Sequence, residues 1–460
     1  MLEHHVEAAL AAVPITLIPE KSSEAWQTEQ PDTVRAWLGK SGFKGKTGAL
    51  SLIPADDGSL AGVVFVTPDT PTLWDFATLP ENLPRGAYAV ADELDADAAT
   101  HLALAWALAG YRFSRYKQDR YDDEAPQLVW PATCRRDEAS YLAEATGLVR
   151  DLINTPAADM GPDGLAQAAQ NLATKHSAAI ALTIGDELLT NNFPAIHAVG
   201  RANDRAPRLI DLMWGPADAP KVTLVGKGVC FDTGGLDIKS AAGMKLMKKD
   251  MGGAAHVLGA ADALMESGLN IRLRVLVPAV ENSISSNAMR PGDVVPTRKG
   301  LTIEIGNTDA EGRVILSDAL AEAAAEKPEL IVDFATLTGS ARIALGTELP
   351  ALFCNDDDLA DGLLAAGKDT SDPLWRMPLW AGYDKMVDGK IGDVNNAPEG
   401  GYGGSITAAL FLQRFVDDDI PWAHIDLMAW NLSPKPGRPE GGEAMGMRAL
   451  VRYLQDRFGA

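Results

Sequence analysis

Apolar and polar positions in the first part of the chain alternate over short distances. Apolar runs at residues 49–54 and 62–67, bounded by polar turn residues, predict strands. Apolar positions recur at helical spacing over residues 98–116, which predicts a helix there. This mixture of short strands and a helix indicates a small α/β domain.

A segment rich in charge and proline follows this helix. Over residues 116–140 the sequence YKQDRYDDEAPQLVWPATCRRDEAS has little hydrophobic periodicity, and such composition is typical of a connection between domains. We therefore predict an N-terminal α/β domain over residues 1–136 and a larger C-terminal domain over residues 137–460.

The C-terminal part alternates buried-strand patterns with helical patterns. Predicted strands cover residues 179–184, 209–214, 222–225, 271–278, 303–305, 330–334, 351–354 and 423–428. Predicted helices cover residues 139–153, 163–176, 252–267, 313–326, 357–366, 405–416 and 444–457. This alternation predicts an α/β/α domain with a central mixed, largely parallel sheet.

Composition narrows the class of protein. The 460 residues include 41 Lys and Arg against 63 Asp and Glu, a net charge of −22, which argues against nucleic-acid binding and against a basic membrane-binding face. The N-terminus lacks a basic signal region and no apolar run reaches about 18 residues, so we expect a cytoplasmic protein without a membrane span. Three cysteines without CxxC and seven histidines without HExxH leave carboxylates as the main ligands of any metal.

Two segments follow predicted strands and gather unusual chemistry. They are VTLVGKGVCFDTGGLDIKSAAGMKLMKKDMGGAAH at 222–256 and IEIGNTDAEGRVILSDAL at 303–320. Asp309 and Glu311 point to the same side if their segment is extended. Together with Asp232 and Asp250 they would make four carboxylates from separate strand ends. The carboxylates of such a group repel one another unless cations are bound. Two divalent ions held by these carboxylates could activate a water molecule.

Each of these residues also has an ordinary structural interpretation. Asp250 can cap the helix that follows it, Asp232 can stabilise a turn, and the acids of the second segment suit the positive end of a helix. Lys227, Lys239 and Lys245 can be solvated surface charges. His256 and the methionines Met244, Met247 and Met251 can be core packing. Taken one at a time, these interpretations are favoured.

The motifs taken together favour a different interpretation. NTDAEGR, with VGKG, FDTGG and KKDMGGAA at these separations, resembles the leucine aminopeptidase (cytosol aminopeptidase) family of dinuclear metallopeptidases. The resemblance covers residues 140–455. In the N-terminal domain it is carried only by GYRFSRYK at 110–117.

The resemblance implies a role for each matching position. Lys227, Asp232, Asp250, Asp309 and Glu311 would bind two divalent ions, Zn or Mn, with Mg or Co as alternatives. Lys239 would polarise the scissile carbonyl, and Arg313 would hold a bicarbonate ion that acts as general base. Met247, Thr336, Gly339 and Met428 would line the pocket for the first side chain, which suits Leu or Met, and the backbone of Leu337 would contact the product side.

The last third departs from the common pattern of the family. Trp430 and the loop at 431–443 replace a short stretch rich in Gly and Thr, and we expect them to alter the substrate mouth or a subunit contact. GYGGS at 401–405 is interpreted as a glycine loop leading into a helix, with a phosphate site as the alternative.

The resemblance therefore implies an aminopeptidase that acts on peptides and assembles as a homo-hexamer, and we expect the N-terminal domain to serve assembly or regulation. Three alternatives stay open. They are a specialised dipeptidase, for example for Cys-Gly, a DNA-binding regulatory protein, and an inactive structural homologue. The acidic charge speaks against DNA binding, and the match at all seven metal-binding and catalytic positions speaks against an inactive homologue.

Overall fold

The computed structural model describes residues 1–9, 11–117 and 125–459, which form two compact units. The first comprises Met1–Gly147 with Ser433–Pro439, and the second comprises Leu148–Leu432 with Glu440–Ala460. The division falls within α6 (Arg136–Asn154). Our boundary between residues 136 and 137 stays a prediction, and residues 118–124 of the expected linker lie outside the described residues.

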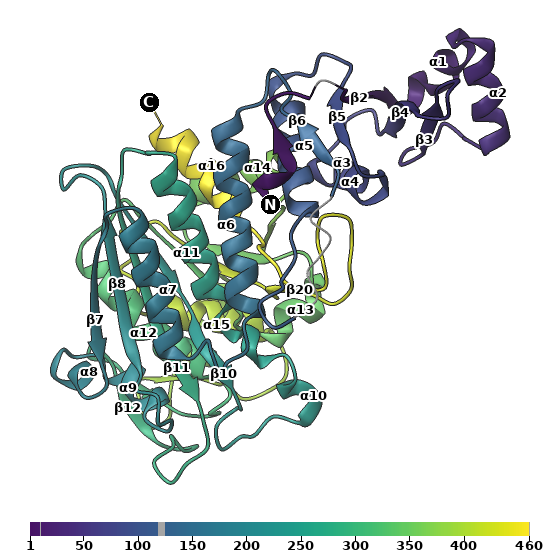
Figure 1. Cartoon of the computed structure of the whole chain (residues 1–460). Helices are drawn as coiled ribbons and strands as arrows, with labels where there is room; N and C mark the ends of the chain where they lie inside the picture. Colours follow the sequence, from purple (N-terminus) through teal and green to yellow (C-terminus); the bar gives the residue numbers. More distant parts are fainter. Residues whose placement is uncertain (10, 118–124, 460) are drawn as a thin grey trace. The chain divides into compact units, whose positions relative to one another are not determined.

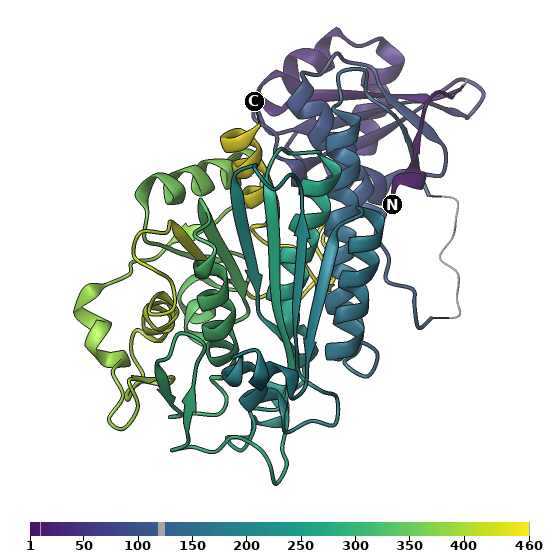
Figure 2. The same ribbon diagram turned by 90° about the vertical axis from the view of Figure 1, so that its left-hand side faces the viewer.

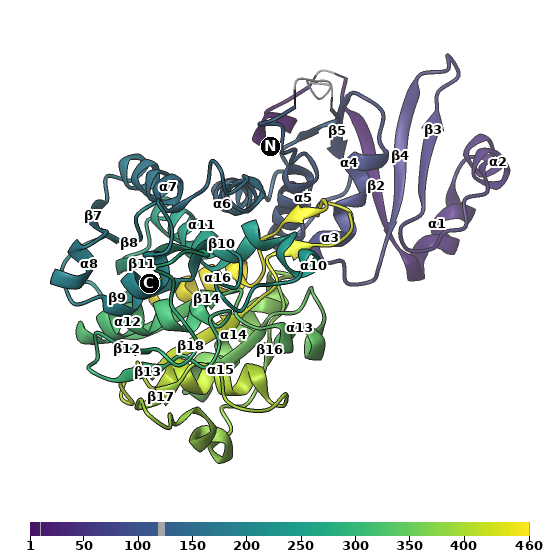
Figure 3. The same cartoon turned by 90° about the horizontal axis from the view of Figure 1, so that it is seen from below.

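The first unit is built on a six-stranded sheet with strand order β1-β6-β5-β2-β4-β3. Neighbouring strands are parallel except β3 and β4, which pair antiparallel at one edge, as Figure 3 shows. The strands are β1 (His5–Val6), β2 (Val13–Pro19), β3 (Leu50–Pro54), β4 (Leu60–Thr67), β5 (Ala87–Val90) and β6 (Gln127–Val129), and the helices are α1 (Ser23–Glu29), α2 (Asp32–Ser41), α3 (Leu73–Phe76), α4 (Thr78–Asn82) and α5 (Ala96–Ala109). The expected helix over 98–116 is therefore too long, because it ends before Gly110, a poor helix former.

The second unit contains a nine-stranded sheet with strand order β16-β15-β18-β14-β9-β11-β8-β7, and β10 pairs with β11. Its strands are β7 (Ala179–Ile184), β8 (Arg208–Trp214), β9 (Lys221–Gly226), β10 (Gly228–Asp232), β11 (Arg272–Asn282), β14 (Leu330–Ala335), β15 (Ala351–Cys354), β16 (Trp375–Arg376) and β18 (Trp422–Asp426). The central strands are parallel, whereas β7 and β8 pair antiparallel with their neighbours. At the other edge β15 pairs antiparallel with β18 and parallel with β16. The mixed α/β architecture predicted from the sequence is confirmed.

Helices cover both faces of this sheet, as Figures 1 and 2 show. One layer contains α7 (Pro162–Lys175), α11 (Gly252–Glu266), α14 (Asp357–Asp369) and α16 (Met447–Phe458), and the other contains α9 (Pro194–Gly200), α12 (Glu311–Ala325) and α15 (Gly404–Gln413). The strands between the layers are mostly apolar on both faces, and β14 is buried along its whole length. Its one acid, Asp333, is hydrogen-bonded to Trp422 and His424 of β18. A largely apolar run of this kind is typical of a parallel strand that is covered on both faces.

Short elements complete the second unit. They are α8 (Glu187–Thr190), α10 (Ala241–Met244), the 3-10 turns η3 (Met247–Met251) and η4 (Ala381–Val387), α13 (Gly339–Leu345), a sheet of β12 (Val294–Pro296), β13 (Thr302–Glu304) and β17 (Val394–Asn395), and a pair formed by β19 (Trp430–Asn431) and β20 (Gly441–Gly442). The strand expected at 303–305 thus belongs to a small separate sheet. No helix within the described ranges is both long and apolar enough to cross a membrane.

Five parallel strands deliver polar residues to one edge of the nine-stranded sheet. Lys227 follows β9, Thr336 follows β14, and Asp232, Asn282 and Asp426 are the last residues of β10, β11 and β18. The carboxyl ends of parallel strands are where ligand sites lie in open α/β sheets. This edge is therefore the candidate site.

Glycines let α11 start directly against this edge. The amide of Ala254 donates to the Lys227 carbonyl at 2.9 Å, and the amide of Lys227 donates to the Phe334 carbonyl at 3.0 Å. A Cβ on Gly253 would lie 2.0 Å from the Phe334 carbonyl oxygen, so that position has no room for a side chain. These hydrogen bonds and this close packing fix the start of α11 against the edge of the sheet.

We predict that Gly253→Ala destabilises the protein by about 2 kcal/mol, because the added methyl forces strand and helix apart. Gly39→Ala is the control, since Gly39 lies in a helix and a Cβ added there would have nothing within 4 Å. Urea unfolding of both variants measures the difference. Equal unfolding midpoints for the two variants would contradict the close packing at Gly253.

Candidate metal centre

Lys227 lies at the centre of the site and is almost fully buried. Its Nζ is 2.7 Å from Asp250 Oδ2 and 3.0 Å from Glu311 Oε1, and it donates to the Thr336 carbonyl at 3.2 Å. A Cβ on Gly312 would lie 2.5 Å from Lys227 Cε, so the glycine after Glu311 leaves the space that the lysine occupies. The glycine of NTDAEGR is thereby explained by packing.

Lys239 makes the second set of ion pairs. Its Nζ is 2.8 Å from Asp232 Oδ2 and also contacts Asp309 Oδ1. The turn that returns Lys239 to Asp232 passes through Gly234 and Gly235, which have φ values of +86° and +64°. Only glycine adopts these backbone conformations readily, which accounts for the pair of glycines in FDTGG.

The loop that carries Asp309 is held by hydrogen bonds to the turn at 234–237 and by one within the loop itself. Thr308 Oγ1 donates to the Gly234 carbonyl at 2.7 Å, and the Thr308 amide donates to Asp237 Oδ2 at 2.8 Å. The amide of Asp309 donates to Asn307 Oδ1 at 2.7 Å. Glu311 then begins α12, so its side chain points inward from the first turn of a buried helix.

Burial and mutual repulsion change the acidity of the carboxylates. Burial and the neighbouring Asp250 raise the pKa of Asp232 to about 6, and burial with Asp232 raises the pKa of Glu311 well above its usual range. Burial also opposes ionisation of Asp250, but Lys227 and Lys249 outweigh it and lower its pKa. Asp232 and Glu311 therefore resist ionisation unless more positive charge is supplied.

The neighbouring acids favour the charged form of both lysines. Burial favours the neutral amine of Lys227, but Asp250, Glu311 and Asp232 outweigh burial and raise its pKa above the ordinary value. The pKa of Lys239 is likewise raised by Asp232 and Asp309 against the effect of burial. Without added cations, both lysines are ammonium ions that neutralise the acids.

The donor set fits divalent metal ions. Asp232, Asp309 and Glu311 each offer a carboxylate oxygen, and these oxygens all lie within 4.8 Å of one another. Within the described residues, Asp250 Oδ2, Asp309 Oδ1 and Glu311 Oε1 are buried and accept no hydrogen bond, although each meets a lysine ammonium. Oxygen ligands of this kind suit hard and borderline cations such as Mg, Mn and Zn.

Arg313 lies in the first turn of α12 and is also buried. Its Nη1 donates to the Asn396 carbonyl at 2.6 Å, while its Nε has no hydrogen bond among the residues that the structure describes. Burial lowers the pKa of Arg313 to about 10, so the guanidinium stays charged at neutral pH. A buried guanidinium with a free donor fits a planar anion.

The residues predicted to line the substrate pocket lie around the same edge of the sheet, but they differ in burial and in the hydrogen bonds that they make. Thr336 Oγ1 donates to Asp250 Oδ1 at 2.7 Å, and the Leu337 amide donates to Asp426 Oδ1 at 3.0 Å. Met428 is buried, Met247 is partly exposed in η3, and Gly339 is exposed at the start of α13. Thr336 thus orients a candidate metal ligand in addition to any contact with substrate.

Three residues that the sequence analysis missed hold the site in place. Asn282 Nδ2 donates to Asp232 Oδ1 at 2.8 Å and to the Thr308 carbonyl at 3.0 Å. Asn396 accepts from the Gly306 amide at 2.8 Å and donates to the Asn307 carbonyl at 2.8 Å, and Asp426 accepts from Thr338. No motif marks these residues, because they come from distant segments. The only available signal was the position of Asn282 and Asp426 at strand ends.

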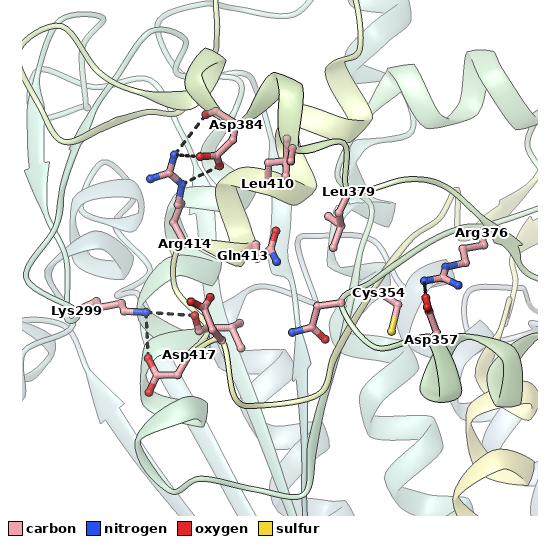
Figure 4. Close-up of a pocket in the computed structure, with 14 residues that line it drawn as sticks. Lys299, Cys354, Asp357, Arg376, Leu379, Asp384, Leu410, Gln413, Arg414 and Asp417 are labelled. Atoms are coloured by element: carbon pink, nitrogen blue, oxygen red, sulfur yellow. Dashed lines mark hydrogen bonds and ion pairs between the residues drawn. The ribbon is translucent and has the colours of Figure 1, made fainter.

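Two other places in the second unit gather polar side chains. His176, Asp262 and Glu266 form a second group whose ligand atoms lie close enough to hold a metal, and Lys175 Nζ lies 2.9 Å from Asp262 Oδ1. A second cavity has a volume of about 850 Å³. The cations that line it are paired, for example Lys299 with Asp417 at 3.1 Å and Arg414 with Asp384 at 2.7 Å, and Figure 4 shows these pairs. Of the described residues that line this cavity, none belongs to the carboxylate group.

Comparison with protein families gives two matches. Residues 147–451 match the model of the cytosol aminopeptidase family, catalytic domain, and residues 13–131 match the model of the M17 aminopeptidase, N-terminal domain. A probable cytosol aminopeptidase of Syntrophotalea carbinolica is 41% identical over 364 residues, covering 76% of this chain and 73% of the relative. One from Rhodopseudomonas palustris is 38% identical over 456 residues, covering 93% and 91%.

Solved structures agree with these matches. The cytosol aminopeptidase from Coxiella burnetii is 48% identical with a TM-score of 0.95, covering 99% of this chain and 100% of that one. The bottromycin maturation enzyme BotP in complex with Mn is 34% identical with a TM-score of 0.87, covering 97% and 100%.

We predict that Asn282→Ala weakens metal binding about 10- to 100-fold, because Asp232 loses the donor that orients it. Asn287→Ala, at an exposed position in the following loop, is the control and should bind as the wild type does. Calorimetric titration of the metal-free proteins with Mn compares them. Equal affinities for the two variants would show that Asn282 does not orient the centre.

Proposed function

Since this chain belongs to the cytosol aminopeptidase family and is an aminopeptidase, we propose that it removes the N-terminal residue of peptides with two divalent metal ions and a metal-activated water. The observation that carries the two-metal proposal is the convergence of three buried carboxylates, those of Asp232, Asp250 and Glu311, with the partly exposed carboxylate of Asp309. Three of the four have an oxygen without a hydrogen bond among the described residues. The family is metal-dependent. Zn or Mn is the expected metal, with Mg or Co as alternatives.

Lys227, Asp232, Asp250, Asp309 and Glu311 are the residues that would hold the ions. When bound, such ions supply an acidic water and stabilise an oxyanion. They also supply the positive charge that lets Asp232 and Glu311 ionise, and they favour the neutral amine that Lys227 needs as a ligand.

Lys239 is proposed to polarise the scissile carbonyl. It is partly exposed, and its ammonium is fixed by Asp232 and Asp309, so it can donate to an oxygen that gains charge. Arg313 is proposed to hold bicarbonate, which would take the proton of the water. Its buried Nε supports this assignment, because within the described ranges it lacks a hydrogen bond.

Substrate selection is proposed to involve the residues beside the centre. Met247, Thr336, Gly339 and Met428 would contact the first side chain, and the backbone of Leu337 would contact the product side. The Leu337 amide already donates a hydrogen bond to Asp426, so the Leu337 carbonyl is the backbone group that would contact the product side. A dipeptidase restricted to particular dipeptides stays the alternative within the family.

We also propose a homo-hexamer, in which the N-terminal domain over 1–136 serves assembly or regulation. The second unit exposes large apolar side chains, including Ile343 at 89% and Tyr402 at 90%, which contacts between subunits would cover. The name of the relatives supports a cytoplasmic location.

The proposed function predicts that a chelator abolishes hydrolysis of leucyl and methionyl peptides and that Mn or Zn restores it. The experiment measures release of the N-terminal residue from a panel of dipeptides and aminoacyl amides, with each of Mn, Zn, Mg and Co added to metal-free protein. Turnover by protein shown to be metal-free by elemental analysis would contradict the two-metal proposal.

We predict that Lys239→Ala lowers kcat about 100- to 1,000-fold on the same substrates, because the developing oxyanion loses a charged donor. Lys245→Ala is the matched control, since Lys245 is exposed six residues further on. Circular dichroism and metal content would establish that both variants fold and load metal. Near-normal turnover of loaded Lys239→Ala would exclude the carbonyl-polarising role.

A further inference from the structure

Asp237 lies on the loop that leads to Lys239 and is exposed to solvent. Its carboxylate is nevertheless engaged, because Asp237 Oδ2 accepts from the Thr308 amide at 2.8 Å, and the Asp237 amide donates to Thr308 Oγ1 at 2.8 Å. Thr308 is only 1% exposed and directly precedes Asp309. Asp237 and Thr308 thus join the loop of a proposed catalytic residue to the loop of a proposed metal ligand.

Side-chain packing contributes little to the position of the loop before Lys239. The residues on either side of Asp237 are apolar but exposed, Leu236 at 42% and Ile238 at 59%. The loop is closed by the Lys239 amide, which donates to the Thr233 carbonyl at 3.0 Å. Since burial of apolar side chains does not hold this segment, its hydrogen bonds must do so. A bond between a carboxylate and a buried amide is among the stronger kinds.

The loop of Asp309 depends less on Asp237. Its backbone is also bound by the side chains of Asn282 and Asn396, as described for the metal centre. Removing the carboxylate of Asp237 would therefore leave Asp309 in place and release the segment that precedes Lys239. The two loops can thus be separated by experiment.

Lys239 needs this support most when cations are bound. In the fold its ammonium is held by Asp232 and Asp309, both of which are proposed metal ligands. Divalent ions at these carboxylates would compete with Lys239 for them and would repel its charge. The backbone then decides where the flexible side chain of Lys239 can reach. A charged donor stabilises an oxyanion effectively only if it is already in position.

We propose that Asp237 is a positioning residue, which anchors the backbone before Lys239 to Thr308 and so keeps Lys239 aligned with the scissile carbonyl. The inference rests on the proposed function and adds to it a residue outside the seven metal-binding and catalytic positions. Lys239 would act on charge that develops during the reaction. Its displacement should therefore lower kcat and leave KM nearly unchanged.

The first test measures kcat and KM of the metal-loaded proteins for a dipeptide that begins with Leu. Asp237→Ala should lower kcat about 10-fold at similar KM, the effect of losing one hydrogen bond to a charged group. Asp237→Asn keeps an oxygen that can accept from the Thr308 amide and should recover most of this loss. Asp218→Ala is the matched control, at an exposed position between β8 and β9, and should behave as the wild type does.

Three further measurements distinguish positioning from a general loss of structure. In the Lys239→Ala background, Asp237→Ala should cause no additional loss of kcat, because Asp237 acts through Lys239. Calorimetric titration with Mn should give metal-free Asp237→Ala the affinity of the wild type, since Asp309 keeps its other supports. Amide hydrogen exchange over residues 236–239 should be faster in Asp237→Ala than in the wild type and unchanged in Asp218→Ala.

The outcomes separate this inference from the proposed function. If the metal-loaded wild type cleaves no peptide, the proposed function fails and this inference fails with it. If the wild type is active but Asp237→Ala keeps its kcat, loses kcat equally in both backgrounds, or binds Mn more weakly, only this inference is overturned. Unchanged hydrogen exchange over residues 236–239 in Asp237→Ala would also overturn it, because the loop would then not depend on the carboxylate.

Discussion

The ion pairs of Lys227 with Asp250 and Glu311 are the interaction on which the site depends. Carboxylate oxygens of Asp232, Asp309 and Glu311 lie within 4.8 Å of one another, where unit charges repel by roughly 3.5 kcal/mol at an effective dielectric constant of about 20. Lys227 and Lys239 balance this repulsion in the fold itself. The same balance leaves carboxylate oxygens that accept no hydrogen bond within the described fold, and these oxygens are what a divalent ion requires.

The parallel sheet makes this concentration of charge possible. β9, β10, β11, β14 and β18 run in the same direction, so their carboxyl ends bring residues from five separate segments to one edge. Glycine at 253 and 312 removes the side chains that would keep α11 and Lys227 away from that edge. The buried apolar strands behind the edge keep it rigid, and Asn282, Asn396 and Asp426 orient the groups in front of it.

Much of the architecture was predictable because it depends on local patterns. The apolar run that forms β14 and the periodicity of α11 and α12 are visible in short windows of sequence. The prediction failed where a neighbouring strand decides the structure. No strand was predicted over residues 228–232, yet Gly228–Asp232 forms β10 because β11 offers a parallel partner. The roles of the site residues stay predictions, although the structure brings Lys227, Asp232, Asp250 and Glu311 together.

The sequence by itself determined the family, the α/β architecture and the aminopeptidase activity, because NTDAEGR and the glycine motifs set residue types at fixed local separations. It could not determine which side chains would meet across the sheet, since those contacts join segments far apart in the chain. Lys248 and Lys249 illustrate the limit. They are adjacent and chemically identical, yet Lys248 donates to the Asn154 carbonyl and lies over the Trp430 ring, whereas Lys249 is buried and makes no such contact among the described residues. Only tertiary packing decides this difference, because burial and hydrogen-bond partners depend on the surrounding elements.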